Sequence, residues 1–238
     1  MILGVSWLAL ALATLAMVLG GVIQASVGLG FALASIPLIA LIETAFIPGP
    51  IILAGTIMVI LIAVRGRADI HRGEIGIGVV GLAIGTAAGA LGLWLIPPAW
   101  SRPVFGLVIL AAVAVSLFAP PIRLDRGTLL AAGTASGVMG TMVGLHGPPL
   151  GLVYQNEPPA RARLMLSTFF IPGTLISMVA LALLGRFGVR EILLGLMLVP
   201  GPLLGLALAP LVARHLDRKR TRYAILAIAA ISGALLLF

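Results

Sequence analysis

Two short stretches interrupt the apolar sequence of this chain without using a single charged residue: QASVGLG at residues 24–30 and GLHGPPL at residues 144–150. Glycine leaves helical geometry readily and lets a ligand approach the backbone, while proline lacks the N–H that a helix interior needs. Since both stretches lie within apolar segments, the sequence predicts that a helix breaks or re-enters at each of them.

The rest of the chain is too apolar for a soluble protein. Of its 238 residues, 61% are hydrophobic and 9% are charged, whereas soluble domains hold about 45–50% apolar and about 25% charged residues. A helix needs about 20 apolar residues to cross a bilayer. We therefore expect an all-α polytopic membrane protein. Its apolar stretches lie near residues 4–26, 28–42, 47–64, 75–96, 103–119, 128–145, 148–156, 164–185, 191–213 and 223–238.

The two interruptions stand at corresponding positions of an internal repeat. Four matches in sequence order share an offset of 116 or 117 residues. They pair residues 21–23 with 137–139, 27–29 with 143–145, Gly85 and Gly89 with Gly201 and Gly205, and Glu74 with Glu191. We expect a single integral membrane domain made of two repeats, residues 1–119 and 120–238.

The placement of basic residues predicts how the repeats are oriented. Two arrangements are possible. If each broken segment counts as one of eight simple crossings, the fifteen Lys and Arg residues divide seven to eight between the two sides of the membrane. If residues 128–156 instead enter the membrane and return to the same side, twelve of the fifteen share one side. Basic residues accumulate in cytoplasmic loops, which favours the arrangement that places twelve of them on one side. It predicts two inverted repeats, each with a glycine-broken segment and three spanning helices, and both termini outside.

Several other functions are disfavoured. The net charge of +8 lies in short connectors beside apolar stretches, as in cytoplasmic loops, so we expect no nucleic-acid partner. The chain has no cysteine, no phosphate-binding loop and no cluster of metal ligands, and we expect no cofactor. Ser136 lies near His146 in sequence, but its glycine context is not that of a serine protease and both residues share one segment, so we expect no enzyme.

The paired interruptions are the candidate binding site. Broken helices at matching places in two halves mark the binding sites of many transporters, and the first turn of a restarting helix offers N–H groups to an anion. No charged residue lies in the middle of a predicted span, so neutral donors would hold the anion. The candidate substrate-binding residues are Gln24, Ser26, Gly28, Gly30, Thr141, Gly144, His146, Gly147, Ser167 and Thr168.

Each of these residues also has a structural interpretation. Glycines let helices pack closely, and hydroxyl groups hydrogen-bond between helices; Gly85 and Gly205 are read as packing positions. His146 either donates to an oxyanion or takes up a proton, or it stays neutral and bonded to a backbone carbonyl. Arg161 and Arg163 either attract anions to the cytoplasmic mouth or, as the charge rule favours, only anchor their loop.

At these motifs the sequence resembles the TauE/SafE family, the sulfite-exporter or organosulfonate-permease type of membrane transporter. The resemblance rests on Gly28-Leu29-Gly30 followed by Pro37-Leu38 in the first half and on residues 144–150 in the second, and it covers the whole chain. It implies transport of a small sulfur-containing anion, such as sulfite, a sulfonate or a sulfur-bearing carboxylate, across the inner membrane.

We therefore expect a secondary transporter that works by alternating access of its two halves. Protons are the candidate coupling ion, and the oligomeric state stays open. The alternative is a non-transporting membrane subunit that scaffolds a larger complex. Substrate-dependent thermal stabilisation would indicate the transporter, whereas stoichiometric co-purification with a partner and no response to ligand would indicate the scaffold.

Overall fold

The computed structural model describes residues 1–27, 30–64, 71–120, 122–212 and 217–238. These residues form helices and no strand, so the all-α prediction is confirmed for them. The helices are α1 (Trp7–Val27), α2 (Phe31–Ile42), η1 (Thr44–Phe46), α3 (Gly49–Val64), α4 (Arg72–Leu95), η3 (Pro98–Trp100), α5 (Ser101–Phe118), α6 (Arg126–Val143), α7 (Gly147–Val153), α8 (Pro159–Leu183), α9 (Val189–Leu198), α10 (Pro200–Val212) and α11 (Arg218–Leu235).

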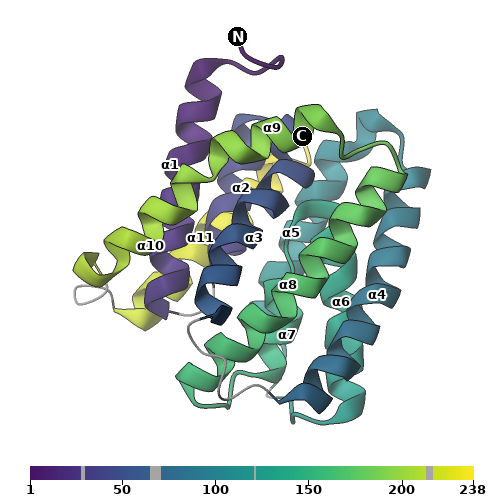
Figure 1. The fold of residues 1–238 in the computed structure, drawn as a ribbon, viewed down its shortest axis with the longest axis vertical. Coiled ribbons are helices and arrows are strands. Elements are labelled where there is room, and N and C mark those ends of the chain that lie inside the picture. Colours follow the sequence, from purple (N-terminus) through teal and green to yellow (C-terminus); the bar gives the residue numbers. More distant parts are fainter. Residues whose placement is uncertain (28–29, 65–70, 121, 213–216) are drawn as a thin grey trace.

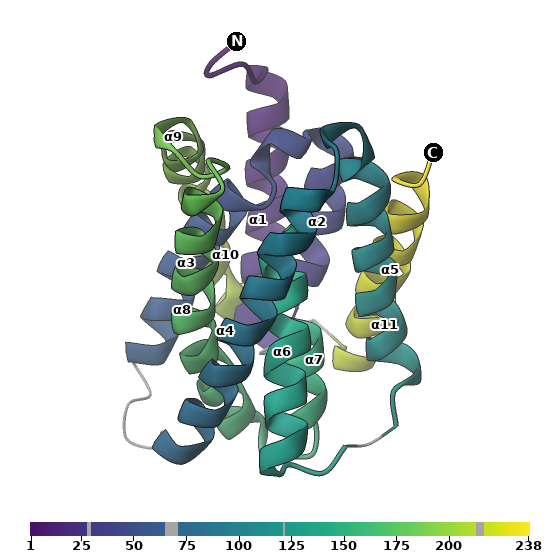
Figure 2. The same ribbon diagram turned by 90° about the vertical axis from the view of Figure 1, so that its right-hand side faces the viewer.

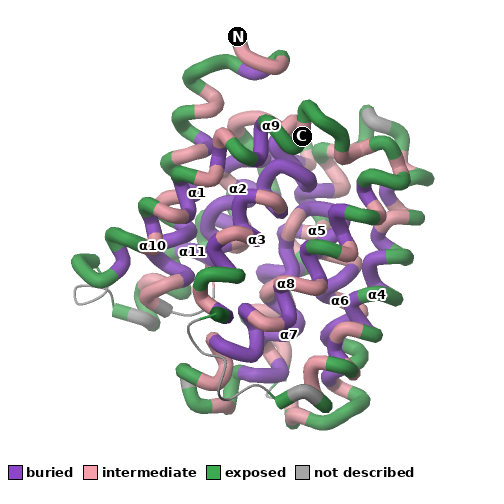
Figure 3. Tube along the Cα trace, in the orientation of Figure 1, coloured by how far each residue is buried: buried purple, intermediate pink, exposed green. Residues whose placement is uncertain are grey.

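Within the described chain, five segments are long and apolar enough to cross a membrane. They are Trp7–Ser26, Gly73–Leu95, Ser101–Phe118, Ala160–Leu183 and Val189–Val212. Their outward faces expose large apolar side chains, while the buried residues gather in the middle of the bundle (Figure 3). Apolar surface on this scale is unfavourable in water and suits contact with lipid.

The two ends of the bundle differ in what they carry. Both termini lie at one end, called the terminal end below (Figures 1 and 2). Helices α4, α6, α8 and α11 begin at the opposite end, called the basic end because Arg126, Arg161, Arg163 and Lys219 lie near the starts of α6, α8 and α11.

Helices α6 and α7 form a hairpin whose turn lies inside the bundle. α6 ends at Val143, and Gly144 follows with φ 90°, a left-handed conformation that glycine adopts without strain. The N–H of Gly144 donates to the carbonyl of Gly140 at 2.8 Å, which closes the helix end. Pro148 and Pro149 stand in the first turn of α7, where a missing N–H is tolerated.

A corresponding turn, the first of the two in chain order, joins α1 to α2, so the turn between α6 and α7 is the second. α1 ends at Val27, and α2 begins at Phe31 after Gly30, whose φ of 131° also favours glycine. Residues 28–29, and with them the predicted site residue Gly28, lie outside the described residues. From this turn α2 runs back toward the terminal end and packs against α1 (Figures 1 and 2).

Glycines allow two pairs of helices to meet backbone to backbone. A Cβ built on Gly85 of α4 would lie 1.9 Å from the carbonyl oxygen of Thr134 in α6. One built on Gly205 of α10 would lie 2.4 Å from the carbonyl oxygen of Val18 in α1. A side chain at either position would push the helices apart, which confirms the packing interpretation of these glycines.

The apolar stretch predicted at residues 191–213 contains two helices rather than one. α9 ends at Leu198 and α10 begins at Pro200, with Val199 between them. Pro200 and Pro202 have no N–H, so the regular hydrogen-bond ladder cannot run through them. The first backbone N–H after Pro202 belongs to Leu203, and it donates to the carbonyl of Val199 at 3.4 Å.

Candidate functional site

A cavity of about 690 Å³ lies where the two glycine-containing turns approach each other. Residues at both turns line it. They are Gln24, Gly30 and Phe31 at the first turn, and Gly144, His146, Gly147 and Pro148 at the second. Five of the ten predicted site residues therefore line one cavity, although they come from opposite halves of the chain.

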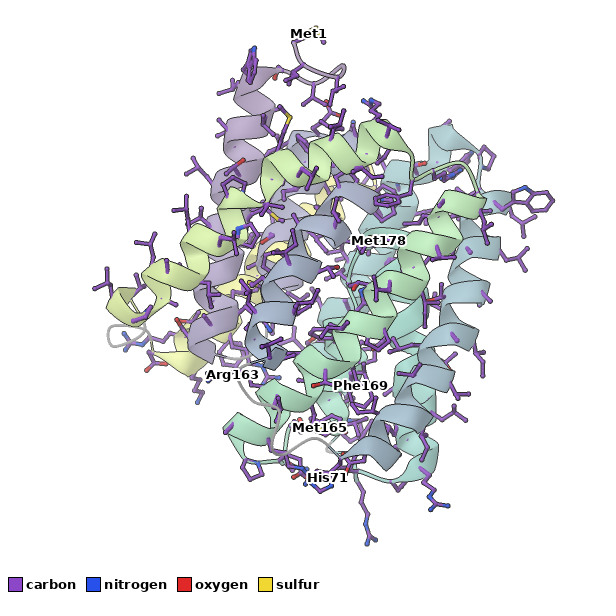
Figure 4. All side chains as sticks on the ribbon, viewed as in Figure 1. Met1, His71, Arg163, Met165, Phe169 and Met178 are labelled. Carbon is purple, nitrogen blue, oxygen red and sulfur yellow. The ribbon has the colours of Figure 1, made fainter. Side chains whose placement is uncertain are left out.

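The cavity is apolar around the turns and basic toward one end. The apolar lining includes Ile51, Ile52 and Phe170, whereas Arg163, Lys219 and Arg222 line it near the starts of α8 and α11. Arg163 lies in the half of the bundle that holds His71, away from Met1 (Figure 4). The cavity therefore extends from the turns toward the basic end.

Gln24 fixes the start of α2 at this cavity. Its side chain is 2% exposed, and its Oε1 accepts a hydrogen bond of 3.2 Å from the N–H of Phe31. Ala32 and Leu33, the next two residues of the first turn of α2, line the cavity. The side-chain amide of Gln24 thus holds the N-terminus of α2 beside the cavity, so the positive end of the helix dipole faces the cavity.

His146 is held by a group of hydroxyls from three helices. Its Nε2 lies 3.2 Å from the Oγ of Ser177 in α8, and the same Oγ lies 2.9 Å from the Oγ1 of Thr141 in α6. Thr86 of α4 approaches this hydroxyl at 3.5 Å. All four side chains are buried. The hydroxyl of Ser177 in α8 therefore connects His146 to Thr141 in α6 and Thr86 in α4, and these contacts position the imidazole.

The imidazole ring fits tightly between glycines. A Cβ built on Gly140 would lie 2.2 Å from its Nε2, and one built on Gly173 would lie 3.3 Å from its Cδ2. The ring therefore contacts the hydroxyl of Ser177 on one side and forms part of the cavity wall on another.

A network of ion pairs and hydrogen bonds lies beside the cavity, with Tyr154 and Glu157 in its lining. The hydroxyl of Tyr154 donates to Glu74 Oε2 at 2.6 Å, and Arg161 Nη2 donates to Glu74 Oε1 at 2.7 Å. Arg161 Nη1 also pairs with Glu157. Tyr154 is 1% exposed and packs against Phe169, with the two ring centroids 5.9 Å apart. These contacts tie the end of α7 to α4 and α8.

Four predicted residues do not line the cavity. Thr141 stands behind His146 and contacts Ser177 instead. Ser26 and Ser167 have no hydrogen-bond partner for their Oγ atoms within the described residues, and Thr168 Oγ1 donates to the carbonyl of Leu164 at 2.8 Å. None of the four is among the described lining residues.

Sequence reasoning missed two groups at this site. Ser177 stands three residues after Thr174 on one face of α8, a weak polar signal in an apolar helix. Tyr154 gave no signal, because its partner Glu74 lies 80 residues earlier. Ser136, weighed as a nucleophile, accepts the N–H of Leu150 at 3.3 Å and so supports the first turn of α7.

A comparison with known protein families finds one match that spans both turns and the cavity. The family model for the sulfite exporter TauE/SafE matches residues 13–236. No curated protein and no solved structure matches the chain.

Proposed function

Since the chain belongs to the TauE/SafE sulfite exporter family, a family of membrane transporters, we propose that it is a secondary transporter of a small sulfur-containing anion such as sulfite or a sulfonate. The observation that carries this proposal is the cavity in which the two glycine turns meet. Discontinuous helices that converge from two halves of a chain are how many secondary transporters build their substrate site.

In the proposed site, the second turn provides few donors. Pro148 and Pro149 have no N–H, and the N–H of Leu150 is engaged by Ser136. The contribution of this turn therefore reduces to the N–H of Gly147 and to the imidazole of His146.

The first turn provides the helix end that favours an anion. Ala32 and Leu33 belong to the first turn of α2, whose N–H groups lack partners within the helix, and both residues line the cavity. We propose that the anion binds between this helix end and His146, with the amide of Gln24 beside it. Neutral donors suit a transported anion, because binding has to be weak enough for release.

Two inverted repeats, residues 1–119 and 120–238, would give the movement that transport needs. The contacts between helices support this: α1 packs on α10 and α4 on α6, while α3 packs on α8 and α5 on α11. A shift by the repeat offset converts the pair of α1 and α10 into the pair of α6 and α4, and it exchanges the members of the other two pairs. The hairpin of α6 and α7 opens toward the basic end, and that of α1 and α2 toward the terminal end (Figure 1). Alternating access would follow from one half moving against the other.

The charges support an orientation in the inner membrane. Among the described basic residues, Arg102, Arg186 and Arg190 lie toward the terminal end, and the others lie toward the basic end. By the positive-inside rule the basic end faces the cytoplasm and both termini face the periplasm. A reporter fused after Phe238 should then be active in the periplasm; activity of a cytoplasmic reporter would contradict this orientation.

The function is tested by flux in proteoliposomes. We expect wild-type protein to carry sulfite and methanesulfonate, and we expect His146→Ala and Gly147→Leu to lose most of this flux. Gly76→Ala is the control, because a Cβ at Gly76 meets nothing within 4 Å. Imposed pH gradients that change the rate would identify protons as the coupling ion.

Two outcomes would contradict the proposal in different ways. No flux with any sulfur-containing anion would contradict the function, and a stoichiometric partner together with no thermal response to ligand would then indicate the scaffold. Full flux in both His146→Ala and Gly147→Leu would contradict the site alone.

A further inference from the structure

Two arginines near the start of α8 have opposite electrostatic surroundings. Arg161 pairs with Glu74 and Glu157, so its charge is compensated. Arg163, two residues later, lines the cavity, and the described residues place no carboxylate within ion-pair distance of it. Its Nε is buried and has no hydrogen-bond partner among them.

The surroundings of Arg163 add positive charge rather than compensate it. Lys219 and Arg222 of α11 line the same cavity. Arg222 Nη2 donates to the carbonyl oxygen of Ser116 at 2.6 Å, which holds it beside α5 without neutralising it. The acidic residue described in the lining, Glu157, is engaged by Arg161. This part of the cavity therefore carries uncompensated positive charge.

A partly buried guanidinium without a counter-charge is unfavourable, because protein surroundings solvate it less well than water does. An anion that enters the cavity supplies the missing charge. The planar fork of N–H donors on arginine matches two oxygens of one oxyanion, whether sulfite or sulfonate.

We infer that Arg163 binds the transported anion at the basic mouth of the cavity, before the anion reaches the neutral site at His146. This inference rests on the proposed function. Lys219 and Arg222 attract anions to the mouth, and Arg163 provides the direct contact. Charge at the entrance and neutral donors at the inner site together favour capture and still permit release.

The test compares charge removal inside and outside the cavity. Sulfite uptake from the side of the basic end is measured at low ionic strength for wild type, Arg163→Gln, Arg163→Lys and Arg126→Gln. Arg126 is exposed in the first turn of α6 and does not line the cavity, so its variant removes one charge from the same end.

We expect Arg163→Gln to raise KM at least tenfold with kcat within about twofold of wild type, because a charge-assisted contact to the substrate is lost. Arg163→Lys should recover most of the affinity, and Arg126→Gln should behave as wild type. The effect of Arg163→Gln should shrink at high salt, since ions screen partly exposed charge. A fall in kcat alone would indicate a structural role and would overturn the inference.

Failure of the inference differs from failure of the proposed function. If wild type carries sulfite and Arg163→Gln does so with the same KM, Arg163 is not a binding residue and the transporter assignment stands. If wild type carries nothing, the rise in melting temperature on adding sulfite decides: a rise that Arg163→Gln loses supports the anion site, and an equal rise or none overturns it. If Arg163→Gln does not fold, Lys219→Gln replaces it, with an expected increase in KM of two- to fivefold.

Discussion

A single methyl group at Gly140 should displace the imidazole of His146. In the structure a Cβ on Gly140 would lie 2.2 Å from the Cδ2 and Nε2 atoms of the ring. The ring would have to move by about 1.3 Å or more to restore an ordinary contact of about 3.5 Å. Gly173 also lies close to the ring, since a Cβ built there would lie 3.3 Å from its Cδ2, and this limits the space for the movement.

The cost follows from the two interactions that the movement disturbs. Overpacking a buried site costs about 1–3 kcal/mol. A ring moved off the hydroxyl of Ser177, now 3.2 Å from Nε2, leaves a buried polar pair unsatisfied at about 1–3 kcal/mol. Together these two costs should lower the free energy of unfolding of Gly140→Ala by roughly 2–6 kcal/mol.

The assay is thermal unfolding of the purified protein in detergent, together with sulfite flux. Gly92→Ala is the matched control, since its nearest neighbour beyond its own helix is the Cε of Met142 at 3.8 Å. Both substitutions gain the same intrinsic helix propensity, about 1 kcal/mol, so their difference isolates the clash. Equal melting temperatures and equal flux for the two variants would refute the placement of the imidazole against Gly140.

Three further predictions concern helix packing and the basic end of the bundle. Tyr154→Phe should lower stability by about 1–2 kcal/mol, because the buried hydroxyl no longer donates to Glu74. Gly85→Ala should separate α4 from α6 and abolish flux or folding, since its Cβ would overlap a carbonyl oxygen of α6. The hydrogen bond from the backbone N–H of Thr128 holds the pKa of Asp125 below 3.8. A carboxyl group whose pKa is lower in the folded than in the unfolded protein stabilises the fold at pH values above its ordinary pKa, and this stabilisation is lost as pH falls. The difference in melting temperature between wild type and Asp125→Ala should therefore shrink below about pH 4.

Each of these predictions has its own control. Tyr223→Phe changes an exposed tyrosine and should leave the melting temperature unchanged. Gly76→Ala introduces a methyl group on the same helix as Gly85 but into open space. For Asp125, a difference in melting temperature that grows as the solution is acidified would contradict the assigned hydrogen bond.

The membrane-spanning character of the chain followed directly from its sequence. Apolar composition and segment length are local properties, and they identified α1, α4, α5 and α8 near their observed bounds. The division of residues 191–213 was missed although Pro200 and Pro202 were visible, because apolar content alone does not report a break in hydrogen bonding.

The candidate site was only partly accessible to sequence reasoning. Gln24, Gly30, Gly144, His146 and Gly147 line one cavity, and the glycine and proline pattern singled them out because backbone geometry there is encoded locally. Ser26, Ser167 and Thr168 were included among the candidate site residues on residue type alone. Hydroxyl side chains in apolar helices also bond to carbonyls of their own helix, as Thr168 does.

Taken by itself, the sequence determined the helical membrane architecture, the two turns and the family, since each depends on residue type and spacing along the chain. Tertiary structure alone decided that Ser177 positions His146, that Tyr154 meets Glu74, and that Arg161 is neutralised whereas Arg163 is not. The partners in the first two contacts are 31 and 80 residues apart. Whether a polar or charged group is compensated depends on which helices pack together, a property that no local pattern contains.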